Sequence, residues 1–218
     1  MRRTYQQRRW PDTPLFQSVA KRWCKNQSFQ LMNLVWQAID RMREADLEKV
    51  PMDGSDEAKE ESLNFLLSLQ IDKLKSGDEP FAVSHQPPEQ NKRKTKNARS
   101  PVPDIGFVWH ENPNCVWPIE GKMLRNPDDL GEYEKEINDN FLSGRYATFS
   151  CEGAMLGYLL SGDAAQTLKN VAKKIRKRLR AHPKLEERNH RISTHERSGV
   201  NKRKKEAFFC HHMAITVY

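Results

Sequence analysis

The sequence predicts a mixed α/β fold in which helices flank a central mixed sheet. Residues 28–77 contain two amphipathic helical stretches. Residues 103–124 contain two short β-branched and aromatic runs joined by a turn with Asn and Pro, and helical and strand-like stretches then alternate. Apolar residues at three- and four-residue steps indicate helices, and short β-branched runs between turn residues indicate strands. The 218 residues suffice for one such domain with an added helical lobe.

The first part of the chain is expected to be helical. Apolar positions from Leu31 to Met42 predict a helix that begins near Ser28 and ends before Pro51. Together with a shorter helix at 15–24, it would form an N-terminal helical lobe over residues 1–54. A second amphipathic helix is expected from about residue 56 to Gly77, and it opens the main domain at 55–218.

Strands and further helices are expected in the rest of the chain. The strands fall at 80–85, 103–110, 116–124, 151–162 and 208–218, the helices at about 128–142 and 164–181, and a basic loop at 86–102. Pro118 cannot donate to a ladder, which favours an edge position or a bulge for its strand. Because side chains alternate along a strand, His211 and His212 are not expected to face the core together.

The net charge of +8 is distributed unevenly. Residues 163–205 contain fifteen Lys and Arg against four Asp and Glu, whereas residues 40–80 contain six basic and twelve acidic residues. The basic region suits a polyanion such as nucleic acid, although the solvated face of an amphipathic helix would carry the same pattern. The residues expected to contact phosphates are Lys92, Arg93, Lys94, Arg145, Lys173, Lys174, Arg176, Lys177, Arg178 and Arg180.

Several classes of protein do not fit the sequence. No stretch approaches the roughly 20 apolar residues that a membrane span requires, and the basic N-terminal residues are not followed by the apolar run of a signal peptide. The four cysteines lie far apart without a CxxC pair, which favours reduced thiols over disulfides or a zinc ribbon. We therefore expect a cytoplasmic protein without membrane contact.

Three charged residues of the predicted hairpin indicate divalent-metal and phosphate chemistry. Asp104 opens the first hairpin strand, and Glu120 stands two residues before Lys122 in the second. Side chains two residues apart share one face of a strand at a spacing of about 7 Å, and Asp104 of the paired strand can reach the same place. Carboxylates bind Mg²⁺, the metal activates a water, and an ammonium counters the charge that develops on a phosphate.

These residues carry a family resemblance. Pro103-Asp104 and, sixteen residues after the aspartate, Glu120-Gly121-Lys122 in a hydrophobic strand resemble the PD-(D/E)XK phosphodiesterase superfamily, which includes restriction endonucleases, repair nucleases and resolvases. The resemblance covers about residues 56–160 and implies a restriction-endonuclease-like α-β-β-β-α-β core, with a C-terminal helix and strand added.

The resemblance also implies roles for individual residues. Asp104, Glu120 and the Gly121 carbonyl would hold Mg²⁺, which Mn²⁺ can replace, and Lys122 would position the attacking water. Many members add a glutamate from the first core helix, for which Glu57, Glu60 and Glu61 are the candidates. The segments 132–141, 145–146 and 153–160 are similar, more loosely, to small nucleases of bacterial antiphage systems.

We therefore expect a metal-dependent nuclease, with DNA favoured over RNA as its substrate and an endonucleolytic mode favoured over an exonucleolytic one. Symmetric cuts in double-stranded DNA need two sites, so a homodimer or a subunit of a defence or repair complex is expected. Two alternatives stay open: a non-catalytic nucleic-acid-binding subunit with a nuclease-like fold, and a basic adaptor that binds a protein through its acidic 40–80 face. In a purely structural interpretation, Asp104 is a turn residue and Glu120–Lys122 an exposed strand end.

Overall fold

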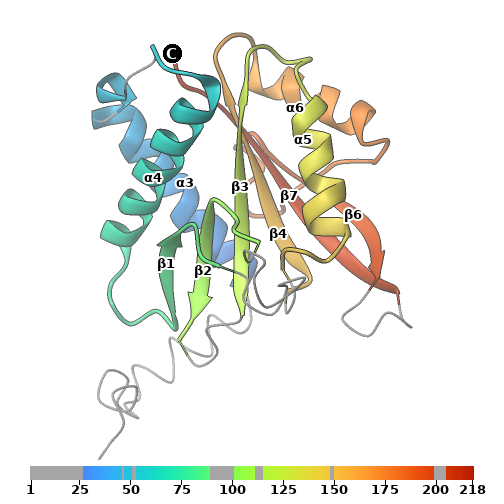
Figure 1. The fold of residues 1–218 in the computed structure, drawn as a ribbon, viewed down its shortest axis with the longest axis horizontal. Helices are drawn as coiled ribbons and strands as arrows, with labels where there is room; N and C mark the ends of the chain where they lie inside the picture. The colour runs from blue at the N-terminus through green and yellow to red at the C-terminus, as the bar shows by residue number, and fades with distance from the viewer. Residues whose placement is uncertain are drawn as a thin grey trace, which may run out of the picture.

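The computed structural model describes residues 27–45, 47–50, 53–88, 101–110, 115–147, 150–198 and 205–218. In these ranges the protein has a mixed α/β fold built on a seven-stranded mixed sheet with helices on both faces (Figure 1). A search of the same ranges for a helix long and apolar enough to cross a membrane finds none.

From α4 to β4 the helices and strands follow the order that the sequence predicts. The helices are α3 (Gln27–Ala45), α4 (Asp56–Leu74), α5 (Gly131–Glu136) and α6 (Ala164–Lys174), with a 3₁₀ turn at Leu47–Lys49 and a π-helical segment at Ile137–Leu142. The strands are β1 (Phe81–His85), β2 (Ile105–Trp109), β3 (Val116–Leu124), β4 (Glu152–Leu159), β5 (Arg180–Ala181), β6 (His190–Ser198) and β7 (Lys205–Thr216). The succession α4-β1-β2-β3-α5-β4 is thus a helix, three strands, a helix and a strand.

The sheet has the strand order β1-β2-β3-β4-β7-β6-β5. β1, β2 and β3 are joined antiparallel, β3, β4 and β7 run parallel at the centre, and β6 and β5 complete the other side antiparallel. Parallel strands need cover on both faces, because their crossover connections carry helices. α3 and α4 cover one face, and α5 and α6 cover the other (Figure 1).

Each face of the sheet therefore has its own hydrophobic core. Trp117 and Ile119 of β3 pack under α3 and α4, whereas Met155 of β4 packs under α5 and α6. The expectation for the histidine pair was wrong for this reason: His211 and His212 are both fully buried, one in each core. His211 packs against Trp117, and His212 accepts or donates a hydrogen bond at 3.1 Å to the Tyr133 hydroxyl.

α3 belongs to the core of α4 and the sheet. Its apolar face contributes to the same cluster as α4, and the Trp36 indole donates to His190 Nδ1 at 3.2 Å. Asp40 pairs with Arg188 at 2.6 Å, which fastens α3 to the turn before β6. The expected helix at 15–24 and most of the basic loop at 86–102 lie outside the described residues.

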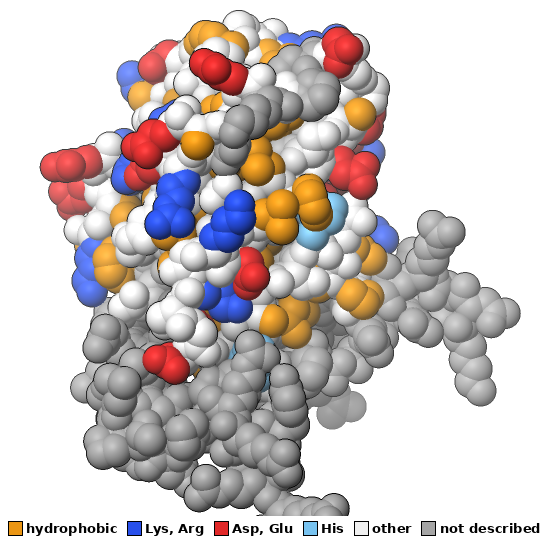
Figure 2. Space-filling model, turned by 90° about the vertical axis from the view of Figure 1, so that its left-hand side faces the viewer, with side chains coloured by type: hydrophobic (Ala, Val, Ile, Leu, Met, Phe, Trp, Pro, Cys, Tyr) orange, Lys and Arg blue, Asp and Glu red, His pale blue; other side chains and the backbone are white. Residues whose placement is uncertain are grey.

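Figure 2 shows the side of the molecule formed by α3, α4 and β1, with acidic and basic side chains interspersed among hydrophobic ones. Phe65 and Leu69 of α4 are exposed there to 50% and 40%. The acidic residues of 40–80 therefore share this side with cations.

The basic helix is shorter than predicted. α6 ends at Lys174, and Arg176 has a positive φ of 52°. Arg176 N–H donates to Lys173 O and Lys177 N–H to Ala172 O, a hydrogen-bond pair that terminates helices and usually has glycine in the left-handed position. No glycine marks this end in the sequence, so the prediction of a helix to 181 was wrong. Arg178 lies in the following turn and Arg180 in β5.

β6 was missed because its buried residues are polar. His190, Ser193, His195 and Arg197 are 5% exposed or less. Ser193 Oγ lies 2.6 Å from His195 Nε2 and 2.7 Å from His212 Nε2, so hydrogen bonds replace the apolar pattern that marks most buried strands.

Pro118 lies in an interior strand, contrary to the expected edge or bulge. β3 pairs with β2 on one side, but its pairing with β4 begins only at Ile119. The missing N–H of Pro118 points toward β4, before that ladder starts, because N–H groups alternate between the two edges of a strand. The proline therefore removes no ladder donor.

Gly121 allows α4 to pack directly on β3. A β-carbon on Gly121 would lie 2.3 Å from Asn64 Oδ1, which accepts a hydrogen bond from the Tyr158 hydroxyl at 2.8 Å. We expect Gly121→Ala to lower the free energy of unfolding by about 1–3 kcal/mol, since the clash displaces this buried amide. Urea unfolding of Asn64→Ala, Gly121→Ala and the double variant tests this. The double variant should lose less than the sum of the single losses, and additive losses would contradict the contact.

Candidate active site

The candidate site forms where β2 leaves β3. The pairing of these strands stops at Ile105 and Ile119, while β3 continues to Leu124. Residues 120–124 of β3 thus present backbone groups on the β2 side without a strand partner, and we call this stretch the open edge. Buried backbone N–H groups need an acceptor, so side chains must replace the missing strand.

Two carboxylates accept hydrogen bonds from the open edge. Asp104, the residue before β2, accepts from Gly121 N–H at 2.8 Å through Oδ2. Glu60, in the second turn of α4, accepts from Met123 N–H at 2.9 Å through Oε2. The ladder that ends at Ile119 is therefore continued by two carboxylates, one from the residue before β2 and one from α4.

Lys122 joins these carboxylates to Glu120. Its Nζ lies 2.8 Å from Glu60 Oε1 and 3.4 Å from Glu120 Oε1, and Glu120 and Lys122 share a strand face as predicted. Burial works against the charged form of Lys122, but Glu120 and Glu60 outweigh it and raise the pKa of the ammonium. Lys122 therefore stays protonated at neutral pH.

The carboxylates themselves resist ionisation. Burial, together with the charges of Glu60 and Glu136, raises the pKa of Asp104 from an ordinary 3.8 to about 6, against the opposing effect of Lys122. Burial and the neighbouring Asp104 raise the pKa of Glu120 well above its ordinary value. Glu120 is only 5% exposed, and its Oε2 has no hydrogen-bond partner among the described residues. The site concentrates more negative charge than Lys122 neutralises.

The structure separates the three glutamates proposed from α4. Glu60 reaches Lys122 and the open edge. Glu57 is exposed and lines the cleft outside the site, and Glu61 is exposed. A helix places only some of its side chains toward a given neighbour, and the sequence did not fix which of these three faces β3.

Two residues of the site were not predicted. Glu136 ends α5, and its charge contributes to the raised pKa of both Asp104 and Glu120. Tyr146 is buried and donates through its hydroxyl to Val102 O at 2.8 Å; burial first, and then Glu120 and Glu136, raise its pKa. The run of charged residues around Glu136 resembles a solvated helix face, so the sequence did not single out Glu136 within the segment 132–141.

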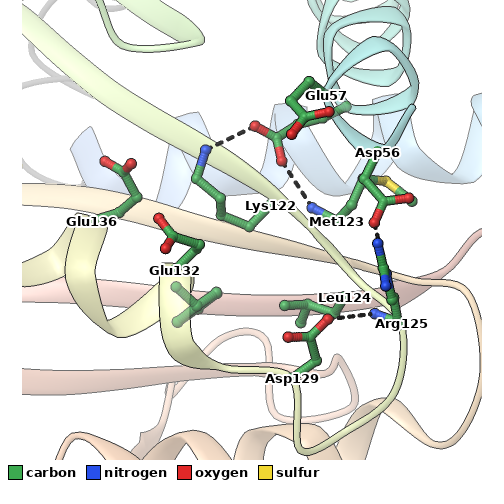
Figure 3. A pocket seen from close by; sticks show the side chains of 11 residues that line it. Asp56, Glu57, Lys122, Met123, Leu124, Arg125, Asp129, Glu132 and Glu136 are labelled. Atoms are coloured by element: carbon green, nitrogen blue, oxygen red, sulfur yellow. Dashed lines mark hydrogen bonds and ion pairs between the residues drawn. The ribbon is translucent and has the colours of Figure 1, made fainter. Parts of the chain in front are cut away.

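A cleft of about 400 Å³ opens between α4, the end of β3 and α5, and Glu60, Lys122 and Glu136 line it. Figure 3 shows Asp56 and Glu57 of α4 on one side of the cleft, Glu132 and Glu136 of α5 on the other, and Lys122 between them. Arg125 lies 2.9 Å from Asp56 at the rim (Figure 3). The cleft leads from solvent to Lys122.

The residues at the open edge fit a hard divalent cation. Mg²⁺ takes one or two protein carboxylates and completes its shell with water or substrate phosphate. Asp104 and Glu120 supply two carboxylates, and Oε2 of Glu120 is an acceptor to which no described residue donates. N–H and C=O of one residue point to the same strand edge, so the Gly121 carbonyl also faces the open edge. Within the described ranges, no set of three His, Cys, Asp or Glu side chains is arranged to hold a metal ion.

The cations expected to contact phosphates are exposed wherever the structure describes them. Lys173, Lys174, Arg176, Lys177, Arg178 and Arg180 are exposed, as is Arg145. Lys174 Nζ lies 3.4 Å from Glu134 of α5, which ties the end of α6 to this helix. Lys92, Arg93 and Lys94 lie outside the described residues.

Comparison with protein-family models, curated proteins and solved structures finds no match to this chain. The interpretation of the site therefore depends on its residues and geometry.

The stability of the Asp104→Asn variant tests whether the site holds more negative charge than Lys122 neutralises. Between pH 4 and 6, folded Asp104 keeps a proton that the unfolded chain has lost, so the free energy of unfolding of metal-free protein should fall as pH rises through this window. At pH 8 without metal the variant should be more stable than wild type by up to about 3 kcal/mol, since one pKa unit is worth about 1.4 kcal/mol.

Urea unfolding from pH 4 to 8, in EDTA and in Mg²⁺, measures this effect. Mg²⁺ should stabilise wild type at pH 8 by more than it stabilises Asp104→Asn, because only the folded wild type offers both carboxylates of this position. Glu57→Gln, which changes an exposed carboxylate of the same cleft, is the matched control and should behave as wild type. A pH-independent difference between wild type and Asp104→Asn would contradict the assignment.

Proposed function

We propose that this protein is a metal-dependent nuclease that hydrolyses phosphodiester bonds of nucleic acid, with double-stranded DNA as the favoured substrate and an endonucleolytic mode. The observation that carries the proposal is the meeting of Asp104, Glu120 and Lys122 at the open edge of β3, together with Glu60. The succession α4-β1-β2-β3-α5-β4 supports a restriction-endonuclease-like core.

A purely structural role accounts poorly for this arrangement. Burying carboxylates costs several kcal/mol each unless they are fully paired, and apolar residues of similar size are often as stabilising. Glu120 is buried, one of its oxygens has no partner in the described part of the chain, and Asp104 is ionised only with difficulty. Such strain is characteristic of functional sites rather than of scaffolding.

The residues divide the work of hydrolysis between them. Asp104, Glu120 and the Gly121 carbonyl would hold Mg²⁺ or Mn²⁺, which when bound polarises a phosphate oxygen and lowers the pKa of a water. Lys122 is held by Glu60 and Glu120 and stays protonated, so it would donate to the attacking water or to a phosphate oxygen and counter the developing charge. Glu60 would act as a positioning residue for this ammonium.

The exposed cations at the end of α6 would bind the phosphate backbone on one side of the scissile bond. Lys174 lies next to Glu134 of the helix that carries Glu136, and Arg176–Arg178 follow Lys174 in the chain, so a strand leaving the cleft over α5 would meet this basic group. Contacts of this kind position nucleic acid without reading its sequence. Symmetric cleavage of a duplex would take two copies of the chain or a partner subunit. A role in bacterial antiphage defence, restriction or repair in the cytoplasm is consistent with this chemistry.

Cleavage of supercoiled and linear plasmid with Mg²⁺ or Mn²⁺ tests the proposal. Wild type and the control Glu57→Gln should cut, whereas Asp104→Asn, Glu120→Gln and Lys122→Gln should each lose at least about 10²-fold in rate, the usual loss for a group that stabilises transition-state charge. Circular dichroism should show all variants folded.

Two other outcomes of this experiment would each favour one of the alternative functions. Salt-sensitive binding of DNA by all variants without any cutting would reject the nuclease in favour of a non-catalytic binding subunit. Absence of both binding and cutting would favour the adaptor.

A further inference from the structure

The helix after β3 changes its geometry at the candidate site. α5 ends at Glu136, and the following segment, Ile137–Leu142, is π-helical, with Ser143 N–H donating to Asn138 O. π-helical turns are rare, occur mostly as single-turn insertions in α-helices, and are frequent at functional sites. The change falls between Glu136 and Asn140, whose side chains contact each other.

Asn140 holds Glu136 while leaving its own oxygen without a donor. Its Nδ2 donates to Glu136 Oε2, and the residue is 6% exposed. Asn140 Oδ1 is buried and has no hydrogen-bond partner in the part of the chain that the structure describes. An unpaired buried amide oxygen is unfavourable, and a bound cation would satisfy it.

Glu120 presents a second such oxygen to the same region. Its Oε2 is buried and unpartnered, while Oε1 lies 3.4 Å from Lys122 Nζ. Glu136 lines the same cleft as Lys122, and Lys122 makes its ion pairs with Glu60 and Glu120. The charge of Glu136 also contributes to the raised pKa of both Glu120 and Asp104.

We propose that Glu120 Oε2, the Glu136 carboxylate and Asn140 Oδ1 form a second divalent-cation site, separate from the one on the Asp104 side of Glu120. Carboxylate and amide oxygens are the ligands that Mg²⁺, Mn²⁺ and Ca²⁺ prefer. Glu120 would be shared by the two positions, with Asp104 and the Gly121 carbonyl as the other ligands of the first ion and Glu136 and Asn140 as those of the second. This deepens the proposed nuclease function and rests on it for its biological role, but the binding of the ion does not require cleavage.

Mn²⁺ binding to the full-length protein, measured by calorimetry and by electron paramagnetic resonance without DNA, tests the site. Wild type should bind two Mn²⁺ per chain with the spectral signature of a coupled pair. Glu136→Gln should bind one, and Asp104→Asn should also bind one, because each variant keeps the other position. Glu132→Gln, an exposed glutamate one turn earlier on the same side of the cleft, is the matched control and should bind two.

Asn140 provides a second, independent test. Asn140→Ala should weaken the second ion at least tenfold, and Asn140→Asp, which restores an oxygen at the same place, should recover it. Two ions in Glu136→Gln, or equal affinity in Asn140→Ala and wild type, would overturn the proposal, as would a single Mn²⁺ in wild type.

The outcomes also separate this inference from the nuclease proposal. Two ions without any cleavage would sustain the second site and reject the nuclease. Cleavage with a single bound ion would sustain the nuclease and reject the second site.

Discussion

The early departure of β2 from β3 is the constraint on which the site depends. Beyond Ile119, β3 has a strand neighbour on the β4 side only, and the N–H groups of Gly121 and Met123 are satisfied by Asp104 and Glu60. Side chains from the start of β2 and from α4 thereby meet the one charged stretch of β3. Backbone hydrogen bonding, which must be completed in any buried strand, is thus the means by which carboxylates are brought together.

The same constraint explains the electrostatics. Carboxylates that replace a strand are buried between two helical layers, and Lys122 is the cation in contact with Glu60 and Glu120 there. The protein therefore holds Asp104 and Glu120 in a state that favours protonation unless a cation arrives. Metal binding, stability and pH are coupled through these two groups, and the stability lost without metal is the cost of keeping a site ready.

The sequence predicted what depends on local geometry. Glu120 and Lys122 share a face because strand side chains alternate, and Asp104 follows from hairpin pairing. Glu60 could not be distinguished from its neighbours because the rotation of α4 depends on tertiary packing. Glu136 was missed because its position next to the site depends on how the crossover from β3 to β4 places α5 on the sheet. The polar interior of β6 and the left-handed Arg176 gave no hydrophobic or glycine signal.

Anomalous diffraction at the manganese absorption edge, from crystals soaked in Mn²⁺ without DNA, tests the central claim most directly. A peak bounded by Asp104, Glu120 and the Gly121 carbonyl, with Lys122 still paired to Glu60, is the predicted result. Crystals in which Mn²⁺ binds only to exposed carboxylates such as Glu57 or Asp129, leaving the open edge of β3 without a peak, would contradict the account.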